Sequence, residues 1–357
     1  MFRLGNKAGW LGLVSLVLLL VIVLPSVLDV FRLNLVSKYL VFAVVGVGIV
    51  LSWGYGGILS LGQGIFFGLG GYLMAMYLKL AASDPELPDF MVWSSTEVLP
   101  WWWEPSHSLT ITLISILILP GVLAFTLSYA IFRKRVSGVY FAIITLALAL
   151  TLTVMIVGQQ GYTGGANGIT DFKTLAGINI ISEESKKVLY FVQVLFVFLV
   201  MGIAAAIIRS RLGKILIAIR DREDRVRFSG YDTALFKAFA FTVGAIFASI
   251  GGALYSLQVG LITPTLIGAV ASIEMVIYVA VGGRLSIVGA VYGALLVGWA
   301  RSFISENFPT LWLFFIGGLF IVITMFLPSG LAGLVSRLGG GSTNGTDRAA
   351  PARRSSK

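Results

Sequence analysis

The sequence contains no cysteine and a single histidine, His107, and only 12% of its 357 residues are charged. Without cysteine the chain forms no disulfide, thiolate metal site or cysteine nucleophile. A charged fraction about half that of a soluble domain excludes an ordinary globular enzyme, and the hydrophobic content excludes a disordered chain. One imidazole, outside the apolar segments, leaves little acid–base chemistry for an intramembrane enzyme.

Long apolar runs fill most of the chain, in which 57% of the residues are hydrophobic and 42 are glycine. Because one membrane-spanning helix needs about 20 apolar residues, these runs predict an all-α polytopic membrane protein with about ten transmembrane helices. Their approximate limits are 10–28, 39–54, 59–80, 109–132, 137–158, 188–208, 234–258, 265–281, 287–304 and 311–327. The first run lacks a small-x-small cleavage site and is interpreted as an uncleaved span rather than a signal peptide.

The basic residues are distributed unevenly between the predicted loops. If residues 1–9 are cytoplasmic and ten spans follow, 19 of the 26 lysines and arginines fall inside and seven fall outside or at outer helix ends. This satisfies the positive-inside rule and predicts that both termini are cytoplasmic. The expected domains are the N-terminus at 1–9, a transmembrane permease domain at 10–330, and a disordered basic cytoplasmic tail at 331–357.

Two glycine-rich stretches resemble each other and suggest a weak internal repeat. Residues 56–68 and 282–293 both contain Gly-Gly-x-Leu-Ser followed by a Gly-x-x-x-Gly pair. Glycines that interrupt apolar segments at matching places indicate a central transport site in repeat-built transporters. Gly57, Gly64 and Gly283 are therefore candidate residues of a translocation pathway, although so short a match also arises by chance.

One hydrophilic segment, residues 209–233, does not fit a span and is predicted to lie in the cytoplasm. Apolar and charged residues alternate in it with helical spacing, and Gly230 is a typical helix terminator. This pattern favours a short amphipathic helix that contacts a protein partner, whereas the alternative is a solvated loop. The candidate contact residues are Ile215, Ile219, Arg220, Glu223, Asp224, Val226 and Gly230.

Polar residues within or beside the apolar segments give the other candidates. Glu274 is the only acidic residue placed within a predicted span, so it either lines the pathway or lies near the outer surface. Gln63 offers an amide to a neutral polar solute, or a hydrogen bond between helices. Thr163 and Asn167 lie in a glycine-rich outer loop that either gates or docks a binding protein, or is a connector. The tryptophans of loop 81–108 favour a membrane-interface belt over ligand stacking.

Several stretches resemble one family of ATP-binding-cassette (ABC) importer permeases, the branched-chain amino acid and urea permeases (LivM/UrtC-like). These stretches are residues 53–72, 139–148, 163–171 and 281–290, and the resemblance extends over roughly 39–330. The hydrophilic segment is similar to the coupling loop of these permeases, with Asp224 and Gly230 at the acidic and glycine positions. Arg225 and Val226 replace the two alanines of that pattern. Residues 167–173 and the tryptophan-rich loop are most similar to the urea permease (UrtC) branch.

The resemblance implies a bacterial inner-membrane permease subunit for urea or a related small amide, and not an enzyme. The chain has no Gly-x-x-x-x-Gly-Lys-Ser/Thr motif, so the resemblance assigns ATP hydrolysis to two separate cytoplasmic ATPase subunits. The other implied partners are a second related permease, a periplasmic solute-binding protein and membrane lipid, with no cofactor, metal or nucleic acid. A branched-chain amino acid permease is the main alternative, and an ion-driven secondary carrier is a further one.

Overall fold

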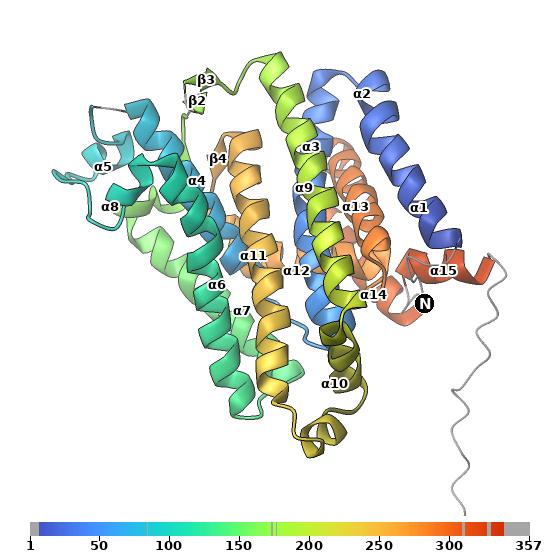
Figure 1. Ribbon diagram of the computed structural model, residues 1–357. Coiled ribbons are helices and arrows are strands. Elements are labelled where there is room, and N and C mark those ends of the chain that lie inside the picture. Colours follow the sequence, from blue (N-terminus) through green and yellow to red (C-terminus); the bar gives the residue numbers. More distant parts are fainter. Residues whose placement is uncertain are drawn as a thin grey trace, which may run out of the picture.

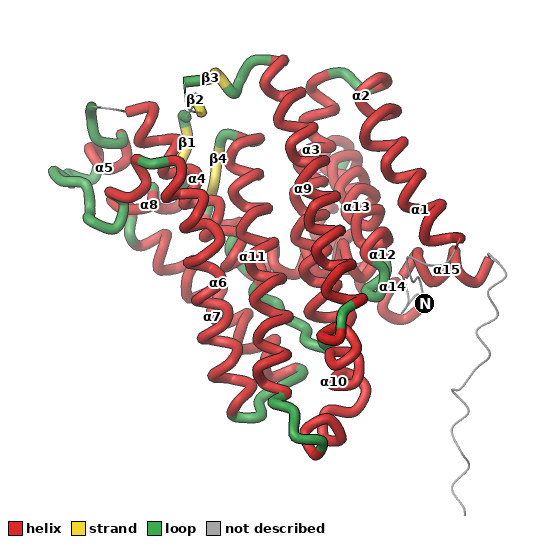
Figure 2. The backbone as a smooth tube through the Cα atoms, in the orientation of Figure 1, coloured by secondary structure: helices red, strands yellow, loops and turns green. Residues whose placement is uncertain are grey.

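The computed structural model describes residues 7–83, 85–172, 174–175, 177–308, 311–326 and 330–338. The described chain is almost entirely helical, with four two-residue strands (Figures 1 and 2). The α-helices are α1 (Lys7–Leu18), α2 (Leu24–Val27), α3 (Val30–Ile49), α4 (Gln63–Ser83), α5 (Asp89–Trp93), α6 (Leu109–Arg133), α7 (Val139–Gly158), α8 (Gln160–Thr163), α9 (Glu183–Arg209), α10 (Arg211–Phe228), α11 (Thr233–Val259), α12 (Ala269–Gly282), α13 (Ile287–Asn307), α14 (Trp312–Phe326) and α15 (Gly330–Leu338). The π- and 3-10 turns are η1 (Leu19–Val23), η2 (Val50–Tyr55), η3 (Glu104–His107), η4 (Gly165–Asn167) and η5 (Pro264–Leu266).

The ten predicted apolar segments all correspond to helices, which confirms an all-α polytopic membrane protein. Eight described helical stretches are long and apolar enough to cross a membrane, and α12 and α14 are shorter. The second span begins at Val30, nine residues before the predicted start at 39, because α3 continues through Asn34 and Lys38. These polar residues ended the apolar run in the sequence without ending the helix.

The first eight residues of the predicted disordered tail are helical. Residues 331–338 belong to α15, which follows the last apolar helix, contacts α12 and α13, and is drawn in red below α1 in Figure 1. Gly330 is buried and residues 331–333 are half-buried, so the first turn of α15 packs on the bundle. The rest of the predicted tail, 339–357, and the first six residues lie outside the described part of the chain.

Helices α3 and α11 form the centre of the bundle, and glycines allow their close contact. A Cβ atom placed on Gly48 would lie 2.9 Å from the Cα of Gly244. A Cβ on Gly252 would lie 1.8 Å from the carbonyl oxygen of Phe67 in α4. The ladder of small residues at 244, 248 and 252 therefore serves helix packing, since backbones this close leave no room for side chains.

The two Gly-x-x-x-Gly pairs of the proposed repeat contact opposite ends of the short helix α12. Gly64 and Gly68 of α4 lie against Ile267, which precedes α12. Gly289 and Gly293 of α13 lie against the last turns of α12, near its residues 278–282. The pairs are thus used in the same way, as flat surfaces that hold a helix too short to span the bilayer alone.

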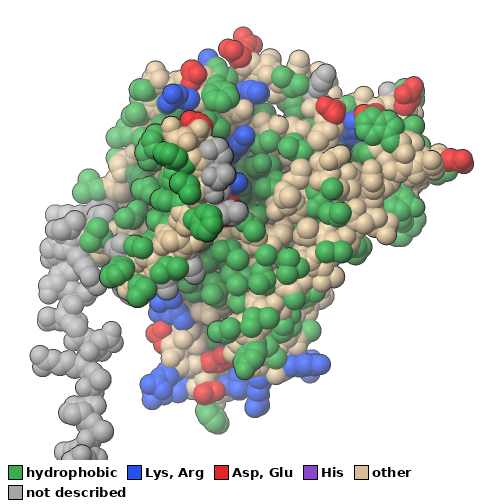
Figure 3. All heavy atoms as spheres, turned by 180° about the vertical axis from the view of Figure 1, so that it is seen from behind, with side chains coloured by type: hydrophobic (Ala, Val, Ile, Leu, Met, Phe, Trp, Pro, Cys, Tyr) green, Lys and Arg blue, Asp and Glu red, His purple; other side chains and the backbone are tan. Residues whose placement is uncertain are grey.

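On the face drawn in Figure 3, charged side chains gather near the two ends of the bundle, with a largely apolar band between them. One end carries α10, and we call it the α10 end. The opposite end carries α5 and α8, and we call it the α5 end (Figure 1). At the α5 end, strand β1 (Ile169–Thr170) pairs antiparallel with β4 (Leu261–Ile262), and β2 (Thr174–Leu175) pairs with β3 (Ile178–Asn179).

Candidate functional site: helix α10 and the interrupted spans behind it

The hydrophilic segment folds as the helix α10, as the alternation of apolar and charged residues predicted. The helix continues to Phe228, but Arg222 has non-helical dihedral angles and kinks it. Gly230 follows with a φ of +85° and no atom within 4 Å of a Cβ placed there. A left-handed backbone favours glycine at this position, so Gly230 turns the chain towards α11.

The apolar side of α10 packs inside this chain instead of facing a partner. Ile219 is only 2% exposed, and Leu216 is buried against Leu51 and Ala240 of the bundle. Ile219 is therefore unavailable as the surface anchor that the sequence suggested, while Ile215 and Val226 are half-buried. A helix with one buried side and one charged side is firmly seated, and only the charged side remains for contact.

Glu223 fixes the outer half of α10 to the start of α11. Its carboxylate accepts hydrogen bonds from Lys237 at 2.5 Å, Arg227 at 3.0 Å and Thr233 at 3.1 Å. Burial by itself opposes ionisation, but Lys237, Thr233 and Arg227 outweigh it and lower the pKa of Glu223 below its ordinary value. Glu223 thus acts within the chain as an internal clamp.

Arg220 joins α10 to the end of the second span. Its guanidinium donates to the carbonyl oxygen of Gly54 at 2.8 Å and pairs with Asp221 at 2.9 Å. Its aliphatic stem packs on Gly57, where a Cβ would come within 2.9 Å of it. Gly57 has a φ of +69°, which favours glycine for a second reason.

The two glycine-rich stretches meet at the same place, next to Arg220. A Cβ on Gly54 would lie 1.9 Å from the carbonyl oxygen of Arg284, and the Tyr55 hydroxyl donates to the carbonyl of Leu285 at 3.2 Å. Gly283, with a φ of +113°, ends α12 just before this contact. The α10 end therefore brings α10, the π-helical end of α3 and the α12–α13 turn into one contact region.

Gln63 begins α4 at a break between two spans, and its environment is unusual. The side chain is 1% exposed, and neither amide atom has a hydrogen-bond partner within the described part of the chain. The next amide, of Gly64, donates to the Ser272 hydroxyl in α12 at 3.0 Å. A buried amide without partners costs free energy, and such groups occur at sites that bind or move polar molecules.

Glu274 is neither at the surface nor isolated, because it forms an ion pair between α12 and α13. It is 6% exposed, and its carboxylate oxygen lies 2.6 Å from the guanidinium of Arg301. The buried hydroxyl of Tyr278 interacts with both charges. A paired carboxylate between two helices fixes their register, whichever solute passes nearby.

The outer-loop candidates lie at the α5 end and are tied to neighbouring structure. The hydroxyl of Thr163 donates to the carbonyl oxygens of Ile156 and Gln159, at 2.7 and 2.8 Å, and so closes the end of α7. Asn167 is exposed beside it. The indole of Trp103 donates to the carbonyl of Tyr162 at 3.0 Å, which joins the tryptophan loop to this loop.

One residue that was not among the candidates from the sequence stands out at the α10 end. Phe228 is 93% exposed at the tip of the segment, next to the exposed Asp224 and Arg225. A solvent-facing aromatic residue in a charged loop is typical of an interface anchor. An aromatic residue inside so hydrophilic a run was the available signal in the sequence.

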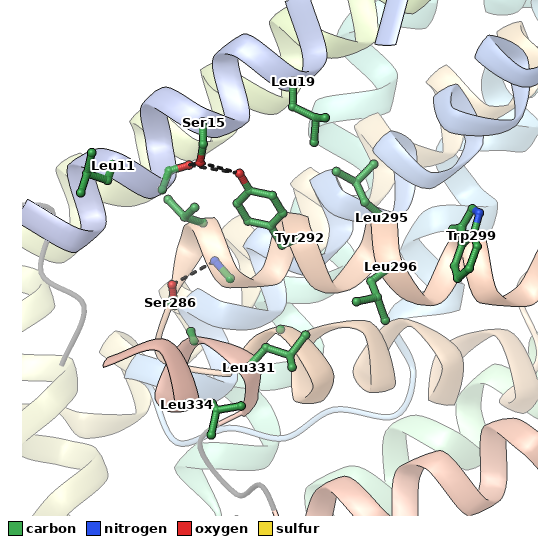
Figure 4. Close-up of a pocket in the computed structure, with 15 residues that line it drawn as sticks. Leu11, Ser15, Leu19, Ser286, Tyr292, Leu295, Leu296, Trp299, Leu331 and Leu334 are labelled. Carbon is green, nitrogen blue, oxygen red and sulfur yellow. Dashed lines mark hydrogen bonds between the residues drawn. The ribbon is translucent and has the colours of Figure 1, made fainter. Parts of the chain in front are cut away.

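A large cavity lies between α1, α13 and α15, with a volume of about 910 Å³ (Figure 4). Leucines from all three helices line it, and its main polar feature is a 2.8 Å hydrogen bond between Ser15 and Tyr292. Such a lining suits apolar chains and not a polar solute. No group of acidic or histidine residues that could hold a metal ion is present among the described residues.

Comparisons with known proteins agree with this arrangement. Residues 31–324 match the family described as the permease component of the branched-chain amino acid transport system. The chain is 23% identical to the high-affinity branched-chain amino acid permease LivM of Escherichia coli K12, over 88% of this chain and 73% of LivM. It is 32% identical to the permease BraD of Pseudomonas aeruginosa, over 44% of this chain and 54% of BraD. No solved structure matches.

Proposed function

We propose that this chain, which belongs to the family of branched-chain amino acid transport permease components, couples to separate ATPase subunits through α10. Its partners would be two ATPases, a second related permease and a solute-binding protein. The α10 end and both termini would lie on the cytoplasmic side of the inner membrane, because most basic residues fall in the segments assigned to that side. The α5 end would receive solute.

One observation carries the proposal: the charged, kinked helix α10, outside the apolar band, is hydrogen-bonded to the chain where the second span ends and the loop to α4 begins. Arg220 links α10 to the carbonyl of Gly54 and to Gly57. A displacement of α10 by an ATPase would therefore move the loop at 56–62 that leads to Gln63. Interfaces with two packing arrangements transmit such displacements, because packed backbones do not deform continuously.

The solute we propose first is a branched-chain or similar amino acid. LivM and BraD, whose printed names state branched-chain amino acid transport, are the relatives that carry this choice. The second candidate is urea or a related small amide. Buried, unpartnered Gln63 favours it, since one amide both donates and accepts hydrogen bonds, as a neutral amide solute requires.

The experiment on coupling uses the complete importer in liposomes. Phe228→Ala removes the exposed aromatic residue, and Gly230→Val strains the turn that follows it. We expect both variants to lose co-purifying ATPase or solute-stimulated hydrolysis, while the binding protein still binds solute. Trp93→Ala is the matched control, because Trp93 is also highly exposed but lies at the α5 end. Normal uptake and hydrolysis in both variants would show that α10 is not the coupling site.

The experiment on solute compares labelled leucine with labelled urea in the same liposomes. Each is supplied together with a solute-binding protein that binds it. Uptake of leucine that urea does not inhibit supports the amino acid, and the reverse result supports the amide. Failure of both substrates to enter would contradict the import function itself.

A further inference from the structure

A second cavity, of about 280 Å³, lies at the α5 end and has a polar lining, unlike the cavity between α1, α13 and α15. It is bounded by the starts of α3 and α9, the end of α11 and the loop around β1 and β3. Three charged side chains line it, Lys38 from α3, Lys186 from α9 and Asp171 from the loop. Two cations and one carboxylate on three separate elements distinguish it from a solvated helix face.

Two lining residues of this cavity, Asn34 and Gln258, begin a chain of amide side chains that leads towards the interior. The Gln258 amide nitrogen donates to the Asn34 side-chain oxygen at 2.8 Å, and that of Gln193 donates to the Gln258 oxygen at 3.1 Å. Gln193 is 1% exposed, and its own amide oxygen has no partner in the described part of the chain. The chain of amides therefore runs from the cavity wall to an acceptor without a partner deep between α9 and α11, and a buried polar group of this kind is unusual away from sites that handle polar molecules.

The carboxylate of this cavity is held in place by the backbone. Asp171 has a φ of +62° and accepts a hydrogen bond from the Thr170 hydroxyl at 2.8 Å. Pairing of Ile169 with Ile262 anchors the loop to β4, and Gly168 lies so close that a Cβ there would be 1.8 Å from the Ile262 carbonyl oxygen. An aspartate in this sparsely populated conformation, on an anchored loop, is positioned in advance of binding.

The size and walls of the cavity limit its ligand. About 280 Å³ corresponds to roughly nine water molecules at about 30 Å³ each, which suits an amino acid or a small amide and not a peptide. Phe172 and Ile180 are buried and supply an apolar wall. Lysine ammonium groups donate only, and the aspartate carboxylate accepts only.

We propose that this cavity is an entry subsite, which binds the transported solute before it reaches the break between spans at Gln63. Lys38 and Lys186 would hold its carbonyl or carboxylate oxygen, and Asp171 would accept its N–H groups. The inference rests on the proposed import function and deepens it by naming the first site within the membrane subunit. Because amino acids and urea share these groups, the experiment uses both.

The test measures uptake of labelled leucine and labelled urea by the complete importer in liposomes, at increasing concentrations of loaded binding protein up to saturation. Lys186→Met and Asp171→Asn each remove one charge of the cavity. Lys187→Met is the matched control, because Lys187 is the exposed neighbour on the same helix and does not line the cavity. We expect the first two variants to lower uptake of the true substrate about tenfold, as loss of a charge-assisted hydrogen bond does, and the control to leave it unchanged.

The outcomes separate the two proposals. If the unmodified importer takes up neither substrate, the import function fails. If it transports, and Lys186→Met and Asp171→Asn match Lys187→Met, the subsite is wrong while the import function stands. A defect that disappears as binding protein is raised to saturation would assign these residues to docking and would also overturn the subsite. Assembly and basal ATPase activity are measured for each variant, and Lys186→Arg is expected to restore uptake if the charge is what acts.

Discussion

The ion pair between Glu274 and Arg301 gives the most direct quantitative prediction about this bundle. At 2.6 Å and an effective dielectric constant of about 20, two unit charges attract by about 6 kcal/mol. Desolvation opposes this by several kcal/mol per buried ion, and the Glu274 side chain is 7% exposed. Arg301 is 41% exposed and keeps part of its solvation, so the net value of the pair is much smaller than the attraction.

Glu274→Gln keeps the shape of the side chain and removes its charge, which leaves Arg301 with a neutral acceptor. Removing one partner of a fully buried pair costs about 3–5 kcal/mol, and the exposure of Arg301 reduces our expectation to about 2 kcal/mol. Unfolding of the purified protein in mixed micelles, followed by circular dichroism, measures this loss. Arg301→Gln is expected to cost a similar amount, because it leaves a buried carboxylate without a positive charge beside it.

The double variant decides whether the loss comes from the pair. With both charges gone, the cost should be less than the sum of the single losses, by about 1–2 kcal/mol for residues in contact. Losses that add to within about 0.5 kcal/mol would show that the two charges do not interact, and the account of α12 and α13 given above would be wrong.

Three other predictions follow from the structure. Folding lowers the pKa of Glu223, so ionised Glu223 stabilises the folded protein fully at a pH above the ordinary glutamate pKa. This stabilisation is lost as the pH falls below that value through the lowered pKa. Glu223→Gln should therefore flatten the acid limb of a curve of unfolding free energy against pH. The chain has no cysteine, so a cysteine at Ser182 should react with an impermeant thiol reagent from outside intact cells and one at Ser137 should not; labelling of the second would reverse the proposed topology. The Cβ added by Gly252→Ala would meet the backbone of α4, so this variant should lower the free energy of unfolding by about 1–3 kcal/mol. Gly202→Ala, where the Cβ would meet open space, is the control and should be neutral or stabilising. Equal effects of the two variants would contradict the close packing of α4 and α11.

The sequence by itself determined the class of protein, because membrane insertion depends on composition and run length alone. Ten apolar segments became ten helices, and the hydrophilic segment became α10. Gly230 ended that segment as predicted, since a left-handed turn favours a residue without a Cβ. Local rules fix such features, and tertiary contacts do not change them.

Only the tertiary structure decided which residues meet. Ile219 has the spacing of a surface anchor but is buried, because the side of α10 that faces the bundle depends on where α3 and α11 lie. Glu274 pairs with Arg301, 27 positions further along the chain, and Arg220 donates a hydrogen bond to Gly54, 166 positions before it. The periodicity of one helix cannot reveal its neighbour, so the clamp at Glu223, the ion pair and the polar cavity at the α5 end all depend on packing between distant segments.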